Sequence, residues 1–174
     1  MKKSLIFTIG HSTRTFAEFA ELLRAHEVEE VVDVRSIPRS RHNPQFNEET
    51  LGKSLKRMHI HYVHLKELGG LRHTKKDSIN LGWHNTSFRG YADYMATPEF
   101  KEGLEELMKI ARLQKTAIMC AEAVPWRCHR SLIADALTKE GWLVEDIMSR
   151  TSATKHRLTP FLKVRKGQLI YPAP

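Results

Sequence analysis

The chain has 174 residues, of which 41% are hydrophobic and 28% charged, as is ordinary for a globular protein. This length suits one domain with a core, and no segment reaches the ~20 apolar residues that span a bilayer. The formal charge of +8 points to an anionic partner. The apolar start of MKKSLIFTIGHST stops early and lacks a cleavage site, so we expect a cytoplasmic protein with reduced thiols.

The first half of the chain alternates apolar runs with helix signals. Thr15 and Glu18 have the spacing of a capping box, and apolar residues follow at helical spacing. Asn47 precedes two glutamates and predicts the N-cap of a second helix. Three apolar runs predict strands: residues 5–10, 30–35 and 60–65.

The second half continues the alternation. Thr97 followed by Pro98 predicts a helix start, and Gly141 predicts the end of a helix over residues 131–140. Further strands are predicted at 116–120 and 142–148, and a small hairpin at 161–172 about Gly167.

The order of these elements predicts an α/β fold. We expect a single three-layer domain over residues 1–174, with a mainly parallel sheet of about five strands and helices on both faces. Ligands of such sheets bind at the carboxyl ends of the strands. Five segments should lie there: 11–14, 35–47, 66–90, 121–130 and 149–158.

Positive charge is concentrated in these five segments. They hold 14 lysines and arginines against three acids, Glu67, Asp77 and Glu122, a balance of +11. The rest of the chain has 14 basic and 17 acidic residues. Polar loops would ordinarily carry acids as well, so the pattern favours an edge of the sheet that binds anions such as phosphate.

Both cysteines lie in one segment, CAEAVPWRCHR (120–130), which is compatible with several kinds of site. Cys120, Cys128 and His129, with His11, could ligate zinc, but this spacing is not a usual zinc pattern, so zinc is a minor possibility and no cofactor is expected. A disulfide across the loop would suit only a redox switch in the cytoplasm.

Two further interpretations of this segment are compatible with each other. Cys128 precedes a predicted helix and adjoins basic residues, which would lower its thiol pKa and make it a nucleophile, with His129 as base and Glu122 as a proton donor or orienting group. Cys120 could instead be a buried small hydrophobe. The start of the helix, with Arg130 and Ser131, could cradle an anion.

The segment 66–90 is long for a plain connection and suggests a lid or binding loop. Trp83 and Phe88 lie among basic residues, a composition that suits stacking on nucleic-acid bases, although Trp83 could equally anchor the loop to the core. The nucleic-acid candidates are Arg72, Lys75, Lys76, Trp83 and Arg89.

Several motifs together resemble a known bacterial family of domains of unknown function, numbered 488. They are TIGHST, VVDVRSIP, YVHLKELGG, YADYM and CAEAVPWRCHR, and they extend over nearly the whole chain. The resemblance implies a fold and a site, and no established reaction. Family members often carry a His-Ile pair in the last strand where this chain has Asp146-Ile147, so a role for that histidine is not transferred.

A weaker resemblance is to rhodanese-like domains. VVDVR, a strand ending in Cys120, and RSLIADALTKEGW (130–142) carry it. Nine residues separate Cys120 from Arg130, however, so a tight anion-binding loop around Cys120 is not expected.

We therefore expect one pocket that combines chemistry and anion binding. Asp33 and Arg35 could belong to it or form an internal ion pair. The expected catalytic residues are Cys128, His129, Glu122 and His11. The expected substrate or anion ligands are Ser12, Asp33, Arg35, Cys120, Arg127, Arg130 and Ser131. The expected function is an enzyme acting on a phosphate-bearing substrate, a nucleotide or nucleic acid; the alternative is a non-catalytic nucleic-acid-binding module.

Overall fold

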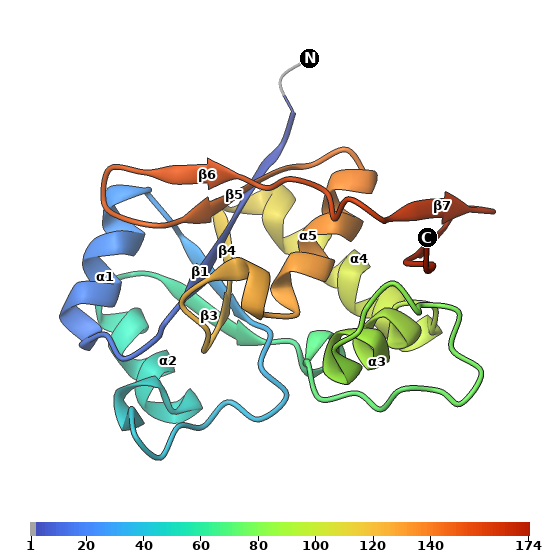
Figure 1. Ribbon diagram of the computed structural model, residues 1–174. Coiled ribbons are helices and arrows are strands. Elements are labelled where there is room, and N and C mark those ends of the chain that lie inside the picture. Colours follow the sequence, from blue (N-terminus) through green and yellow to red (C-terminus); the bar gives the residue numbers. More distant parts are fainter. Residues whose placement is uncertain (1–2) are drawn as a thin grey trace.

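A computed structural model describes residues 3–174 and contains a six-stranded sheet with strand order β3-β2-β4-β1-β5-β6 (Figure 1). The first five strands in chain order are parallel, and β6 is antiparallel to β5. Their bounds are Leu5–Gly10 (β1), Glu30–Asp33 (β2), His61–His64 (β3), Thr116–Cys120 (β4), Leu143–Ile147 (β5) and Ala153–Lys155 (β6). The predicted mainly parallel sheet is confirmed.

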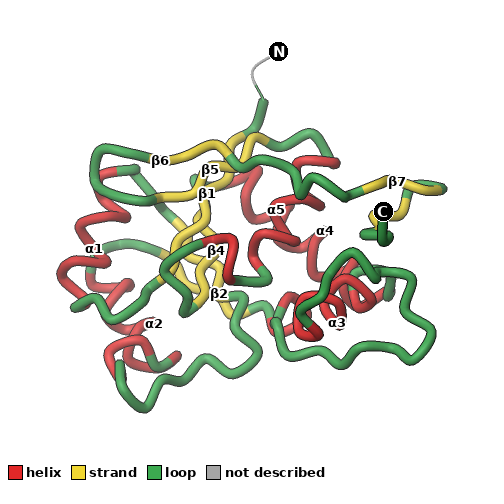
Figure 2. Tube along the Cα trace, viewed as in Figure 1, coloured by secondary structure: helices red, strands yellow, loops and turns green. Residues whose placement is uncertain are grey.

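Helices cover both faces of the sheet, which confirms the three-layer α/β architecture (Figures 1 and 2). On one face, Phe19 and Leu51 belong to the core that α1 (Phe16–Ala25) and α2 (Glu48–Arg57) form with the sheet. On the other, Leu107 and Leu132 belong to the core of α3 (Thr86–Tyr94), α4 (Pro98–Leu113) and α5 (Arg130–Lys139). None of the helices in residues 3–174 is long and apolar enough to cross a membrane.

Two of the three predicted N-caps are confirmed. Thr15 and Glu18 form the predicted capping box of α1, and Thr97 accepts a hydrogen bond from the Phe100 amide at 3.3 Å at the start of α4. Asn47 stands at the start of α2 but does not cap it through its side chain. Its Oδ1 accepts a hydrogen bond from the Ser40 amide at 2.7 Å, so tertiary contact with the preceding loop overrides the local signal.

Part of the segment predicted as a lid is regular structure. It begins with a 3-10 turn, Lys66–Leu68, and ends in the first residues of α3, which Asn85 caps through the Ser87 and Phe88 amides. The buried carboxylate of Asp93 in α3 accepts hydrogen bonds from the intervening loop, from Lys75 N, Ser78 Oγ and Asn80 Nδ2. These bonds tie the loop to the body of the protein.

The segment 149–158, which follows β5, does not stay at the carboxyl edge of the sheet as expected. Within 149–158, β6 turns back along β5 and pairs Lys155 with Glu145. A three-residue exposed strand carries no apolar pattern, so the sequence did not signal it. The C-terminal hairpin consists of β7 (Lys163–Arg165) and β8 (Gln168–Ile170), with Lys166 and Gly167 at positive φ in its turn.

Candidate functional site

The segment 121–130 lies directly over the end of β1. The His11 amide donates to the Cys120 carbonyl and the Ser12 amide to the Ala121 carbonyl, both at 2.9 Å. Gly10 makes this approach possible, because a Cβ there would lie 1.6 Å from the Glu122 carbonyl oxygen. Ser12 has φ 51°, a left-handed conformation that is uncommon for serine and is found more often near functional sites.

Arg130 lies at the centre of this crossing and is 1% exposed. Its guanidinium donates to Cys120 Sγ (2.7 Å), to the Glu122 and Ala123 carbonyls (2.6 and 3.2 Å) and to Thr8 Oγ1 (3.2 Å). Arg130 therefore fixes the loop and places a positive charge against one thiol. These donors are already used within the protein, and the predicted anion cradle is not what Arg130 forms.

Ser131 and the first amides of α5 are likewise engaged. Ser131 Oγ donates to the Cys128 carbonyl at 2.9 Å, and the Ser131 amide donates to the same carbonyl. The Arg130 amide donates to Cys128 Sγ. The first turn of α5 thus serves to hold Cys128 in place.

The two cysteines form a buried dithiol. Cys128 Sγ donates to Cys120 Sγ at 2.6 Å. Burial raises the pKa of the Cys120 thiol, but the hydrogen bond from Cys128 and the charge of Arg130 outweigh it and hold that pKa below its usual value. Burial and the adjacent Cys120 sulfur raise the pKa of Cys128 well above its usual value. The sequence predicted the lowered pKa for Cys128, and the structure assigns it to Cys120.

His129 is oriented to interact with the dithiol. Its Nε2 lies 2.8 Å from the Val34 carbonyl and so carries the proton, which leaves Nδ1 as an acceptor 3.6 Å from Cys128 Sγ. Burial, with the nearby charge of Arg130, lowers the His129 pKa to about 4. The imidazole is therefore neutral near pH 7, with its unprotonated nitrogen on the side facing the sulfur.

This lowered pKa makes stability depend on pH. Between about pH 6.5 and about pH 4 the unfolded chain binds a proton on His129 that the folded chain excludes, so stability present above pH 6.5 is lost on acidification. Between pH 7 and pH 5 we expect a loss of about 1 kcal/mol from His129, after a discount for its partial exposure. Urea unfolding at pH 7 and pH 5 measures it.

His129→Gln is the matched variant, because the glutamine amide can still donate to the Val34 carbonyl without titrating. Its unfolding free energy should change less between pH 7 and pH 5. The stability of the variant should still depend on pH, since burial also lowers the pKa of His11. An unchanged pH dependence in this variant would show that folding does not lower the pKa of His129.

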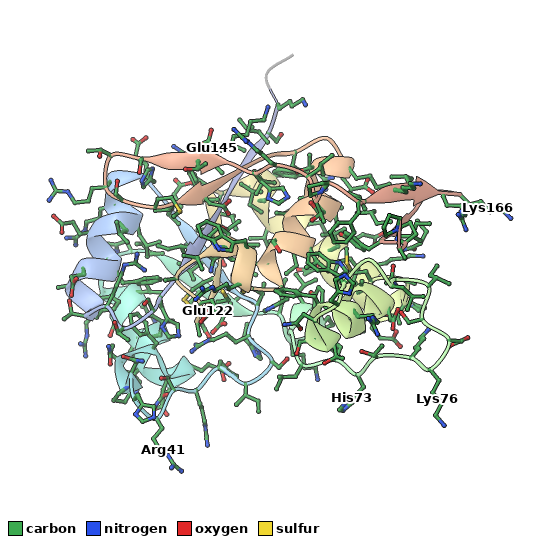
Figure 3. The ribbon with its side chains drawn as sticks, in the orientation of Figure 1. Arg41, His73, Lys76, Glu122, Glu145 and Lys166 are labelled. Atoms are coloured by element: carbon green, nitrogen blue, oxygen red, sulfur yellow. The ribbon has the colours of Figure 1, made fainter. Side chains whose placement is uncertain are left out.

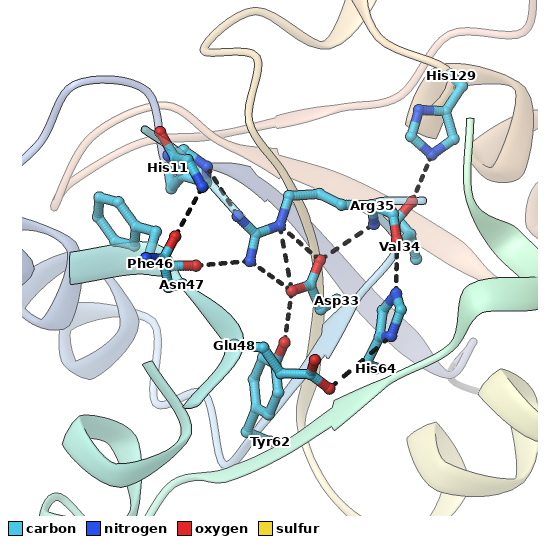
Figure 4. A network of polar contacts seen from close by, with 11 residues as sticks. His11, Asp33, Val34, Arg35, Phe46, Asn47, Glu48, Tyr62, His64 and His129 are labelled. Atoms are coloured by element: carbon cyan, nitrogen blue, oxygen red, sulfur yellow. Dashed lines mark hydrogen bonds and ion pairs between the residues drawn. The ribbon is translucent and has the colours of Figure 1, made fainter. Parts of the chain in front are cut away.

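Asp33 and Arg35 form the internal ion pair considered from the sequence (Figure 4). Arg35 Nη2 donates to Asp33 Oδ2 and to the Phe46 carbonyl, both at 2.7 Å, and Tyr62 OH donates to the same carboxylate oxygen at 2.6 Å. His11 stacks on Phe46 with ring centroids 4.3 Å apart, and its Nε2 lies 3.4 Å from Arg35 Nη1. This network braces the loop after β2.

A cavity of about 430 Å³, here called the cysteine pocket, adjoins the dithiol. Six of the expected site residues line it: Arg35, Cys120, Glu122, Arg127, Cys128 and His129. Five others do not, namely His11, Ser12, Asp33, Arg130 and Ser131. The sequence did not single out Ser36, Arg39, Asn85 and Ser87, which also line it. Arg39 could have been found, because it lies in the basic segment 35–47.

Most of the nucleic-acid candidates have internal partners. Arg72 lies 3.6 Å over the Tyr94 ring and donates to the Gly69 carbonyl, and Arg89 donates to the Trp83 carbonyl at 2.9 Å. Trp83 packs on Phe88 and Phe161, each with centroids 4.9 Å away, so it anchors the loop to the core. Lys75 and Lys76 are exposed, and Lys76 extends away from the body of the protein (Figure 3).

Within the described chain, no three or more histidine, cysteine, aspartate or glutamate side chains come together as a group that could hold a metal ion.

Comparisons with known proteins identify the family. The model of the family described as "Domain of unknown function DUF488" matches residues 15–137, which include Asp33, Arg35 and the whole segment 120–130. Neither the curated proteins nor the solved structures gave a match. The match extends over more than half of the sequence, so the chain belongs to the DUF488 family.

Proposed function

We propose that this protein is an enzyme that acts on a phosphate-bearing substrate, a nucleotide or nucleic acid, in the cysteine pocket. The observation that carries the proposal is the environment of Cys120. Its sulfur receives hydrogen bonds from Arg130 and Cys128 and lines a cavity. A thiol with a lowered pKa supplies the thiolate that a nucleophilic cysteine needs.

The neighbouring groups support proton transfer. Cys128 donates its proton toward Cys120, and the neutral His129 presents Nδ1 to Cys128. In the proposed site Cys120 is the nucleophile, Cys128 stabilises its thiolate by donating a hydrogen bond, and the neutral His129 lies beside Cys128. Glu122 is exposed at the pocket and is the remaining acid–base candidate.

Arginines at the pocket supply the phosphate contacts. Arg39 and Arg127 are exposed and line the cavity, where Glu122 is the one acidic residue among those described. Arginine pairs with phosphate oxygens through two parallel hydrogen bonds, so these two side chains suit an anionic substrate. We place the enzyme in the cytoplasm, where both thiols stay reduced.

The alternative, a non-catalytic nucleic-acid-binding module, has less support. It relied on the basic loop edge with Trp83 or Phe88 stacking on bases. Trp83 and Phe88 pack on each other, and Arg72 and Arg89 have partners within the protein. A binding module also does not need a buried thiol beside a buried arginine.

The thiolate assignment predicts distinct titrations for the two cysteines. Absorbance at the thiolate band, followed against pH, should show one thiol ionising below its usual range in the wild type. Cys120→Ser should abolish that transition. Cys128→Ala should move it to higher pH, because Cys120 loses a hydrogen-bond donor. The double variant provides the baseline.

Turnover tests the function itself. In a screen of nucleotides and short oligonucleotides, Cys120→Ser should lose turnover, while its affinity for inorganic phosphate stays within about twofold, since sulfur supplies no positive charge. Replacing both Arg39 and Arg127 with glutamine should weaken phosphate binding by about tenfold or more. Full turnover by Cys120→Ser would exclude the proposed nucleophile. Salt-sensitive binding without any turnover would favour the binding module.

A further inference from the structure

A second cavity adjoins the segment that carries the cysteines. Arg127, Cys128 and His129 line the cysteine pocket, whereas Pro125, Trp126 and Ser131 line this second cavity. Its volume is about 530 Å³, within the ~300–1,000 Å³ of small-molecule sites. We call it the tryptophan cavity. The two cavities are thus adjacent, separated by a few residues of one loop.

Trp126 presents an uncovered aromatic surface at the tryptophan cavity. It is 66% exposed, and it follows Pro125 in the 3-10 turn Pro125–Arg127. Trp83 and Phe161 also line the cavity, but these two rings pack on each other. Met148 and Leu158, which are also exposed, line the same cavity, and an exposed apolar patch of this kind marks an interaction site. The stacking residue expected at Trp83 therefore has a better candidate in Trp126.

Positive charge adjoins this aromatic surface. Lys155 and Arg157 line the cavity, are exposed, and form no ion pair within the described chain. The acid that lines the cavity, Asp146, is buried and accepts a hydrogen bond from Thr8 Oγ1. A flat exposed ring beside two unpaired cations matches a base and its phosphate, because every base has a face that stacks on aromatics.

We propose that Trp126 stacks on an unpaired nucleobase of the substrate while Lys155 and Arg157 hold an adjoining phosphate. This inference rests on the proposed function and names its substrate class as a ligand with an accessible base. A base in the tryptophan cavity would set the neighbouring part of the same ligand near the cysteine pocket. Base-paired duplex, whose bases are covered, should bind more weakly.

The test compares probes with and without bases. Fluorescence anisotropy measures binding of a labelled single-stranded oligothymidylate and of an abasic oligomer of the same length, and calorimetry measures thymidine monophosphate. Trp126→Ala should weaken binding of a base-bearing probe by about tenfold and leave the abasic oligomer unchanged. Trp126→Phe should restore most of the loss. Replacing Lys155 and Arg157 with glutamine should weaken both oligomers and reduce the salt dependence.

Leu113→Ala is the control, because Leu113 is 84% exposed at the end of α4, and its affinities should equal those of the wild type. If Trp126→Ala weakens binding of oligothymidylate alone, the ligand is a polymer. If it also weakens binding of thymidine monophosphate, the ligand is a nucleotide. Either result supports the inference. An equal loss for the abasic oligomer, or no loss from Trp126→Ala, overturns it. Phosphate binding and cysteine-dependent turnover would still stand in that case, so the two failures are distinguishable.

Discussion

Arg130→Met is expected to destabilise the protein by about 3–5 kcal/mol and to raise the pKa of the Cys120 thiol. The guanidinium is the donor shared by Cys120 Sγ, the Glu122 and Ala123 carbonyls and Thr8 Oγ1. Methionine fills a similar volume but donates no hydrogen bond, so these acceptors lose their partner in a buried position. Urea unfolding measures the first effect and the thiolate titration the second.

Two further variants separate charge from geometry. Arg130→Lys keeps the charge but cannot reach several acceptors at once, so its stability and thiol pKa should lie between those of the wild type and Arg130→Met. Arg127→Met removes an exposed arginine three residues earlier, and stability should change by no more than about 0.5 kcal/mol. If Arg130→Met keeps the wild-type thiol titration, Arg130 does not stabilise the thiolate.

The elements of the fold that follow from short-range signals were predictable. The capping box at Thr15 and the Thr97-Pro98 helix start appear where the sequence predicts them. Helix α3 was missed, because its sequence contains glycine and several polar residues. Gly90 is needed there for packing, since a Cβ would lie 2.4 Å from the Arg72 carbonyl oxygen. That requirement comes from tertiary contact and leaves no periodic pattern.

The site was predictable in its location and not in its roles. The segment 120–130 does carry the dithiol, and six of the expected residues line one cavity. Which cysteine has the lower pKa depends on the direction of the Arg130 side chain. That direction follows from the pairing of Gly10 with Cys120 across β1 and β4, which sequence spacing does not reveal.

The count of positive charges in the loops did not predict which of them face the cysteine pocket. Arg35 is bonded to Asp33, Arg130 to Cys120 and Arg72 to backbone carbonyls. Lys155 lies along the antiparallel strand β6, beside β5, and does not face the cysteine pocket. A net charge counts all these residues equally, although those with internal partners have fewer hydrogen-bond donors left for a ligand. Arg39 and Arg127 are the arginines that remain for the cysteine pocket.

Gly10→Ala is expected to destabilise the protein by about 3 kcal/mol or more and to disrupt the dithiol. The new Cβ would lie 1.6 Å from the Glu122 carbonyl oxygen and 2.8 Å from Arg130 Nη1. A backbone carbonyl cannot yield by rotating a side chain, so the segment 121–130 must move away from β1. This movement would withdraw Arg130 from Cys120, and the lowered thiol pKa should be lost together with stability.

Gly52→Ala is the matched control. Gly52 lies inside α2, and a Cβ there would meet only the Tyr62 ring, at an ordinary 3.6 Å. Alanine favours a helix over glycine, so Gly52→Ala should stabilise the protein by about 0.5–1 kcal/mol and leave the thiol titration unchanged. Urea unfolding of both variants, with the thiolate absorbance followed in the folded protein, measures the contrast. If Gly10→Ala is as stable as the wild type and keeps its thiol titration, the loop does not lie against β1 as described, and the assignment of the thiolate to Cys120 fails with it.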